Sequence, residues 1–193
     1  MIFPLNPTIY RDGRLTDEEF YAFCQANPTL RIEREADGQI IFEMPTNTET
    51  SLTNAALNGE VYVWNRTTEL GYVFDSNGRF TLIDTSVRAP DMPWISRARW
   101  DALPEEKQNK FAAICPDFVI ELMSDSDEKY TLPAKMEKYL QNGVQLGWGI
   151  DPFNSQTTIY RPNAEPETKS FDDELSGEDI LPGFTLRLRE IMN

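Results

Sequence analysis

The sequence contains no histidine among its 193 residues. This absence excludes Ser-His-Asp triads, imidazole general bases and zinc sites built on histidine. Any catalysis therefore has to use carboxylates, lysine, tyrosine, hydroxyl groups, or a metal ion held by oxygen ligands.

Cysteine and long apolar segments are also scarce. The two cysteines, Cys24 and Cys115, make no disulfide framework, and we expect both to be ordinary small hydrophobic residues in a reducing compartment. No apolar run approaches the roughly 18 residues of a membrane span. Residues 1–7 lack the basic and apolar regions of a signal peptide. We therefore expect a cytoplasmic protein that does not associate with membranes.

Positive charge is in the minority as well. The 32 Asp and Glu residues outnumber 18 Lys and Arg residues, and the net charge is −14. A negative net charge is unfavourable for a protein that mainly binds nucleic acid, because affinity for nucleic acid comes largely from neutralising its phosphates. A local basic groove or bound divalent cations could offset it. Residues 94–111, expected to be helical in part, are the most basic stretch, although a solvated helix face explains this more simply.

The length of the chain predicts a single domain, residues 1–193. Its first third predicts two helices and a β-hairpin. Residues 16–27 begin with a capping box and predict an amphipathic helix. Apolar and polar residues alternate on both sides of Asp37-Gly38 in residues 30–44, which predicts a β-hairpin. Nothing in this hairpin indicates a functional site. Residues 49–69 predict the longest helix, with an apolar side that consists of Leu52, Ala55, Ala56, Gly59 and Val63.

The rest of the chain predicts mostly strands. We expect a helix at residues 131–143, closed by Gly143, and a polar, acidic loop at residues 162–179. The expected strands are residues 71–75, 79–84, 86–91, 118–123, 146–152, 157–161 and 181–188.

The stretch around Glu121 is the most informative in the chain. Residues 118–123 are apolar apart from this carboxylate, and they lie between Pro116 and a polar turn at residues 124–127, which predicts a buried central strand. A glutamate in such a strand loses hydration, so it should be paired, protonated or bound to a metal. The carboxyl end of a strand is also where open α/β sheets bind ligands. A partly exposed Glu beside an Arg or Lys explains the pattern equally well.

Asp91 and Lys135 stand out together with Glu121. Asp91 follows a proline, which suits a strand end, so we expect it at the mouth of the sheet. Lys135 lies in the first turn of the next helix, where the dipole disfavours a cation, as expected if it faces carboxylates. Two carboxylates suit Mg²⁺ or Mn²⁺, and a nearby lysine can orient or deprotonate an attacking water. The three residues predict metal-assisted hydrolysis of a phosphodiester.

In combination, eight short segments resemble the Uma2 family, also called DUF820, which is abundant in cyanobacteria. The resemblance covers nearly the whole chain and implies an α/β (α+β) fold of the PD-(D/E)XK restriction-endonuclease type, a mixed central sheet flanked by helices. By the same resemblance Asp91 is the motif aspartate and Glu121 is the acidic residue of the (D/E)XK position. The segments are Arg31-Ile-Glu-Arg34, Met44-Pro-Thr46, Val73-Phe-Asp-Ser76, Arg88-Ala-Pro-Asp91, Cys115-Pro-Asp-Phe-Val-Ile-Glu-Leu122, Lys135-Met-Glu-Lys-Tyr139, Asn142-Gly143 and Leu181-Pro-Gly-Phe184.

The sequence departs from the (D/E)XK pattern after Glu121, where Leu122-Met123 replaces the usual X-Lys. The family pattern instead carries a lysine on the following helix, and Lys135 matches that position. A lysine on the next helix can place its ammonium group where the lysine of the (D/E)XK strand would place it.

Other acids compete for the remaining positions. Glu49 and Glu60, eleven residues apart on the predicted long helix, are both candidates for the first-motif acid. Asp117 is a rival to Asp91, because it follows a proline and shares strand parity with Glu121. The spacing and context favour Asp91.

The leading hypothesis is a Mg²⁺-dependent endonuclease that acts on nucleic acid, with DNA as the first choice. Nucleases of this fold often pair to cut both strands, so the resemblance also implies a homodimer. One alternative is a catalytically silent binding or regulatory module, which the negative charge and the displaced lysine favour. Another is a metal-dependent hydrolase of a small phosphorylated substrate, for which an acidic surface is less of a handicap.

Overall fold

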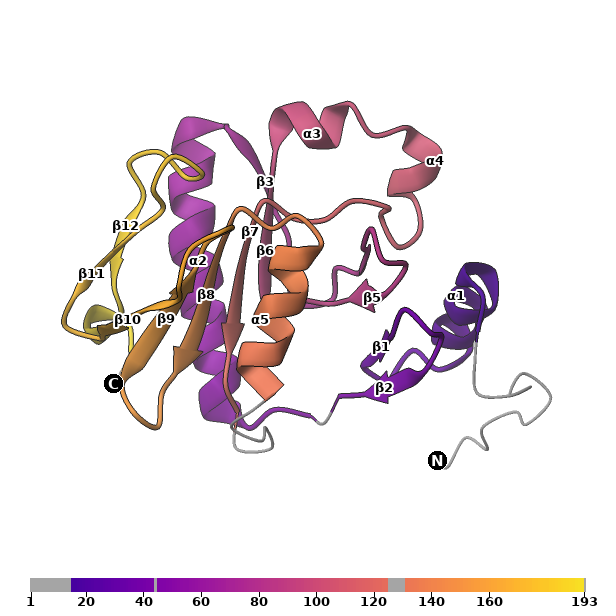
Figure 1. The fold of residues 1–193 in the computed structure, drawn as a ribbon, viewed down its shortest axis with the longest axis horizontal. Coiled ribbons are helices and arrows are strands. Elements are labelled where there is room, and N and C mark those ends of the chain that lie inside the picture. The colour runs from indigo at the N-terminus through magenta and orange to yellow at the C-terminus, as the bar shows by residue number, and fades with distance from the viewer. Residues whose placement is uncertain (1–14, 44, 125–130, 193) are drawn as a thin grey trace.

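The structure is a computed structural model that describes residues 15–43, 45–124 and 131–192 (Figure 1). Its centre is a six-stranded mixed sheet in the order β10-β9-β8-β7-β6-β3. Neighbouring strands are antiparallel except β7 and β8, which are parallel. The strands are β3 (Gly71–Val73), β6 (Met92–Ser96), β7 (Phe118–Leu122), β8 (Leu146–Asp151), β9 (Gln156–Tyr160) and β10 (Glu167–Ser170). The predicted central strand and mixed sheet are confirmed.

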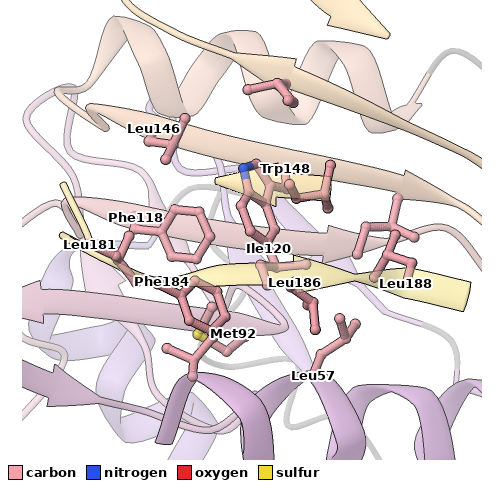
Figure 2. Close-up of a cluster of buried hydrophobic side chains, with 14 of the residues drawn as sticks. Leu57, Met92, Phe118, Ile120, Leu146, Trp148, Leu181, Phe184, Leu186 and Leu188 are labelled. Atoms are coloured by element: carbon pink, nitrogen blue, oxygen red, sulfur yellow. The ribbon is translucent and has the colours of Figure 1, made fainter. Parts of the chain in front are cut away.

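Two helices cover opposite faces of this sheet, α2 (Thr48–Thr68) on one and α5 (Thr131–Gln141) on the other (Figure 1). Because side chains alternate along a strand, β7 contributes to both interfaces. Phe118, Ile120 and Leu122 join the apolar cluster that includes α2 (Figure 2). Val119 joins the cluster that includes α5. Glu121 has the parity of Val119, so it faces α5.

A smaller sheet, in the order β2-β1-β5-β4, lies beside the first. Its strands are β1 (Ile32–Arg34), β2 (Ile40–Phe42), β4 (Phe80–Thr81) and β5 (Val87–Arg88). The predicted hairpin is confirmed, with Gly38 at positive φ in its turn. Helix α1 (Asp17–Ala26) packs Phe20 and Phe23 into a third apolar cluster, and the predicted capping box between Thr16 and Glu19 is present.

The predicted apolar side of the long helix is wrong as a core face. Leu57 and Val61 are the buried apolar residues of α2, whereas Leu52 and Val63 are 64% and 53% exposed. Both sides of this helix carry apolar residues, so periodicity alone selected the wrong one. Asn47 caps the helix by accepting a hydrogen bond from the Thr50 amide.

Two segments contain strands that the sequence did not predict. Residues 92–96 form β6, where Pro93 argues against a central strand, and only the following residues are helical. Residues 162–179, predicted as a loop, include β10 and β11, because β10 is a largely exposed strand whose residues do not alternate in polarity. The remaining elements are α3 (Arg97–Asp101), α4 (Glu105–Gln108), β11 (Glu174–Ser176), β12 (Thr185–Arg187) and the 3₁₀ helix η1 (Leu188–Glu190).

No helix in the part of the chain that the structure describes is long and apolar enough to cross a membrane. Both cysteines are free; Cys115 is buried and Cys24 is half-buried. Residues 1–7, which were assessed for a signal peptide, lie outside the described residues. So does most of the predicted polar turn at residues 124–127.

Candidate active site

A pocket of about 410 Å³ lies between the β1–β2 hairpin, the carboxyl end of β7 and helix α5. Its lining includes all three residues that the sequence brought together, Asp91, Glu121 and Lys135. The charged residues around it are four basic and five acidic: Arg31, Arg88, Lys135, Lys138, Glu33, Glu35, Glu43, Asp91 and Glu121.

Glu121 reaches this pocket from the otherwise apolar strand β7 and is 4% exposed. The Tyr139 hydroxyl donates a hydrogen bond to its Oε1 at 2.7 Å, and the Lys135 ammonium donates to its Oε2 at 3.1 Å. Lys135 and Tyr139 are four residues apart on α5, so one helical face holds both donors. The carboxylate is therefore fixed at two oxygens by one helix.

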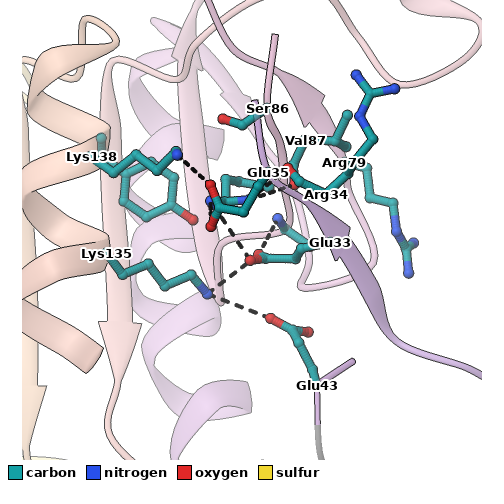
Figure 3. Close-up of polar contacts among 12 residues, drawn as sticks. Glu33, Arg34, Glu35, Glu43, Arg79, Ser86, Val87, Lys135 and Lys138 are labelled. Atoms are coloured by element: carbon teal, nitrogen blue, oxygen red, sulfur yellow. Dashed lines mark hydrogen bonds and ion pairs between the residues drawn. The ribbon is translucent and has the colours of Figure 1, made fainter. Parts of the chain in front are cut away.

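Lys135 lies among three carboxylates, two of which, Glu33 and Glu43, are seen beside it in Figure 3. In addition to Glu121, its Nζ is 3.4 Å from Oε1 of Glu33 and 3.5 Å from Oε1 of Glu43. Glu33 belongs to β1, and Glu43 directly follows β2. The lysine thus joins the hairpin to the central sheet.

Asp91 lies in the link between β5 and β6, one residue before β6, rather than at the end of a strand. The antiparallel register pairs Met92 with Ile120, which brings Asp91 beside the end of β7. Its Oδ2 accepts a hydrogen bond of 2.9 Å from the Leu122 amide, and its Oδ1 accepts one of 3.2 Å from Asn54 of α2.

Glu33 is the residue of this pocket whose importance the sequence did not indicate. It is 4% exposed, and its Oε1 accepts a hydrogen bond of 2.8 Å from the Ala89 amide. Arg88 is 3.6 Å from its Oε2. The Arg31-Ile-Glu-Arg34 segment contributed to the family resemblance, and this was the one signal that could have identified Glu33.

A second group of charges continues the pocket along the hairpin. Glu35 accepts hydrogen bonds from Arg88 and Lys138, each at 2.5 Å. Lys138 also lies 3.4 Å from Asp84. Lys138 therefore pairs with Glu35 and Asp84. Lys135, which lies one turn earlier on the same helix, pairs with other carboxylates.

Burial and charge move the pKa values of these groups in different directions. Burial raises the pKa of Glu121 to about 8; Lys135 opposes the rise, and Asp91 and Glu33 add to it. Burial also acts on Glu33, but Lys135 and Arg88 outweigh it and lower the pKa of Glu33. Burial raises the pKa of Glu43. Burial thus opposes ionisation of Glu121 and Glu43, whereas the neighbouring cations favour ionisation of Glu33.

The two α5 donors keep their protons. Burial disfavours the charged form of Lys135, but Glu121, Glu33 and Glu43 outweigh it and hold the pKa of Lys135 well above its ordinary value. Burial and the neighbouring Glu121 raise the pKa of Tyr139 well above its usual range. Both groups act as hydrogen-bond donors at neutral pH.

The donor atoms around the pocket fit a hard divalent cation. Carboxylate oxygens suit Mg²⁺ or Mn²⁺, and Mg²⁺ commonly takes only one or two protein carboxylates, with water or phosphate oxygens completing its shell. Asp91 and Glu121 supply such a pair. Within residues 15–43, 45–124 and 131–192, no group of three or more His, Cys, Asp or Glu side chains is arranged to hold a metal ion. Lys135 supplies the positive charge among three of the carboxylates.

The other candidate acids lie elsewhere. Glu60 is exposed on α2, and Glu49 lines a separate cavity of about 470 Å³. Asp117 is buried at the opposite end of β7 from the pocket, where it accepts hydrogen bonds from the Ser96 amide at 2.8 Å and from Arg99 at 2.6 Å. None of these three acids lines the pocket that contains Asp91, Glu121 and Lys135.

Comparisons with known proteins relate the chain to a protein family and to a solved structure. The family model described as "Uma2: Putative restriction endonuclease" matches residues 17–189. No curated protein was found to match the chain. The fold is similar to the crystal structure of "a putative nuclease belonging to DUF820 from Anabaena variabilis ATCC 29413", with a TM-score of 0.71 and 22% identity over 83% of this chain and 89% of that chain. At this identity the likeness supports the nuclease-like fold and nothing finer.

Proposed function

The chain belongs to the Uma2 family. From this membership and the geometry of the carboxylate pocket, we propose that it hydrolyses phosphodiester bonds of nucleic acid with the help of a divalent metal ion. DNA is the substrate that we propose first. The observation that carries the proposal is the meeting of Asp91, Glu121 and Lys135 in one pocket, although they come from the β5–β6 link, strand β7 and helix α5. Asp91 and Glu121 would hold Mg²⁺ or Mn²⁺, which when bound would polarise a phosphoryl oxygen and lower the pKa of a water.

In this proposal the chain's own groups position the reactants. Tyr139 and Lys135 orient the Glu121 carboxylate through its two oxygens. The Leu122 amide and Asn54 orient Asp91. Because the pKa of Lys135 is raised well above its ordinary value, the lysine acts as a donor that positions the attacking water and stabilises negative charge, and not as the base.

The test that needs no knowledge of the substrate is calorimetric titration of Mn²⁺ and Mg²⁺ into the full chain. We expect stoichiometric binding that Asp91→Ala and Glu121→Ala each remove. Asp117→Ala serves as the control, since Asp117 does not line the pocket. Because a phosphate can complete the metal shell, each titration is repeated with a non-hydrolysable phosphodiester present. Binding that survives both pocket substitutions under both conditions would refute the proposed metal ligands.

A second candidate, hydrolysis of a small phosphorylated molecule, is favoured by the size of the pocket. A volume of about 410 Å³ is in the range of small-molecule sites, and Ile41, Phe42 and Leu132 give it an apolar wall. Rates on plasmid, duplex and single-stranded DNA and RNA, compared with rates on mononucleotides and bis(4-nitrophenyl) phosphate, separate the two candidates. A rate that rises with polynucleotide length supports the nuclease.

A further inference from the structure

The outward side of helix α2 is apolar although it lies opposite the core. Leu57 and Val61 point into the sheet. On the other side of the helix, Leu52 and Val63 are 64% and 53% exposed. Exposed apolar residues gathered on one face commonly mark a contact with another molecule. In the part of the chain that the structure describes, nothing buries these two side chains.

Five exposed residues and the half-buried Ala56 follow a regular spacing along this side of the helix. Alternating steps of three and four residues connect Glu49, Leu52, Ala56, Gly59, Val63 and Arg66. This spacing is the a/d repeat by which two helices pack side by side. We call these six residues the α2 seam.

Gly59, at the middle of the seam, is not required by the packing or the backbone geometry of the described residues. A Cβ added to it would meet nothing within 4 Å, and its φ is not in the left-handed region. Glycine nevertheless weakens the interior of a helix. A second helix that approaches closely would explain it, because small residues let two backbones come together.

The order of residue types in the seam is symmetric: charged, apolar, small, small, apolar, charged. An antiparallel two-fold pairing therefore places Leu52 against Val63, and Ala56 against Gly59, of the second copy. It also places Glu49 against Arg66, which are opposite in charge. Neither of these two residues has an ion-pair partner among the described residues. A parallel pairing would instead oppose like charges at both ends.

From this symmetry we propose that the chain forms a homodimer in which the α2 seams of two copies pack antiparallel. The interface is isologous, as a closed two-fold dimer requires. The seam covers 18 residues of helix, about 26 Å. A single helix pair is a small contact beside a standard interface of roughly 1,200–2,000 Å². We therefore expect weak association, with a dissociation constant on the order of 10–100 µM.

Sedimentation velocity of the full chain, over concentrations that bracket this constant, tests the proposal. We expect a reversible monomer–dimer equilibrium for the wild-type chain. Gly59→Gln should shift it at least tenfold towards the monomer, because the new side chain separates the helices. Thermal unfolding should show an unchanged or higher Tm, since the position is open in the monomer and glutamine favours a helix. Ser51→Gln, which adds the same side chain to an exposed site of α2 outside the seam, should change the equilibrium little.

A charge exchange tests the orientation. Arg66→Glu alone should weaken the dimer, because it opposes Glu49 of the second copy, and the double variant Glu49→Arg/Arg66→Glu should recover the association. A wild-type chain that stays monomeric throughout the range would overturn the proposal. So would a Gly59→Gln variant that associates as strongly as the wild type, or a double variant that fails to recover.

Discussion

Glu121→Gln is expected to abolish hydrolysis and, at the same time, to make the metal-free protein more stable. Loss of a metal ligand should lower the rate on bis(4-nitrophenyl) phosphate more than about 100-fold, because even changes behind the ligands cost 10–100-fold in affinity or activity. The stability gain follows from the buried carboxyl. Its pKa is 4.5 in an ordinary setting and about 8 in the folded protein.

The sign of the stability change follows from proton binding. Between pH 4.5 and about 8, the folded chain holds a proton on Glu121 that the unfolded chain releases, so wild-type stability falls as the pH rises through this range. Glutamine does not titrate. The variant should therefore gain about 2–3 kcal/mol of unfolding free energy at pH 7 and almost nothing below about pH 4.5. Urea unfolding in the presence of a chelator, at both pH values, measures the difference.

Asp117→Asn is the matched control, since it alters the other buried carboxylate of the same strand region. Asp117 accepts charge-assisted hydrogen bonds from Arg99 and from the Ser96 amide. Its substitution should lower stability by about 1–3 kcal/mol and leave metal binding unchanged. If Glu121→Gln also lowered stability at pH 7, Glu121 would be a structural ion-pair residue and not a strained functional one.

Local sequence patterns predicted the elements that local chemistry determines. The capping box of Thr16 and Glu19, the turn at Asp37-Gly38 and the apolar run around Glu121 all depend on residues a few positions apart. These predictions were correct because the residues that determine each element lie within that element. The parity of Glu121 within β7 was likewise readable from the strand itself.

The role of Glu33 could not be predicted in this way. In the sequence it is one charge among several in an alternating hairpin. In the structure it is buried because Arg88 and Lys135, about 55 and 100 residues away, surround it. The hairpin thus supplies two carboxylates, Glu33 and Glu43, to a pocket whose other parts are encoded much later in the chain.

The misassigned face of α2 has a related cause. Both sides of this helix carry apolar residues, and the side with Leu57, Val61 and Trp64 is the one that packs against apolar side chains of the sheet. Periodicity detected the apolar stripe that contains Leu52 and Val63, but it could not tell whether the chain itself or another molecule would cover that stripe.

Lys135→Met should separate metal binding from hydrolysis. The methionine keeps much of the volume and the helix propensity but removes the ammonium from among Glu33, Glu43 and Glu121. A lysine that positions water and stabilises charge should cost about 10²–10⁴-fold in rate when it is removed. The carboxylates lose a competing cation, so Mn²⁺ affinity should stay the same or increase.

Stability should report the same separation. Without metal, Lys135→Met leaves carboxylates buried with fewer counter-charges, and its Tm should fall. Saturating Mn²⁺ should raise the Tm of this variant by more than it raises the wild-type Tm, because binding to the folded state alone adds stability. Lys138→Met is the matched control: it removes a lysine one turn along α5 that pairs with Glu35 and Asp84, and its rate should fall less than about tenfold. Parallel loss of Mn²⁺ binding and activity in Lys135→Met would mean that the lysine assembles the site rather than acting on the attacking water.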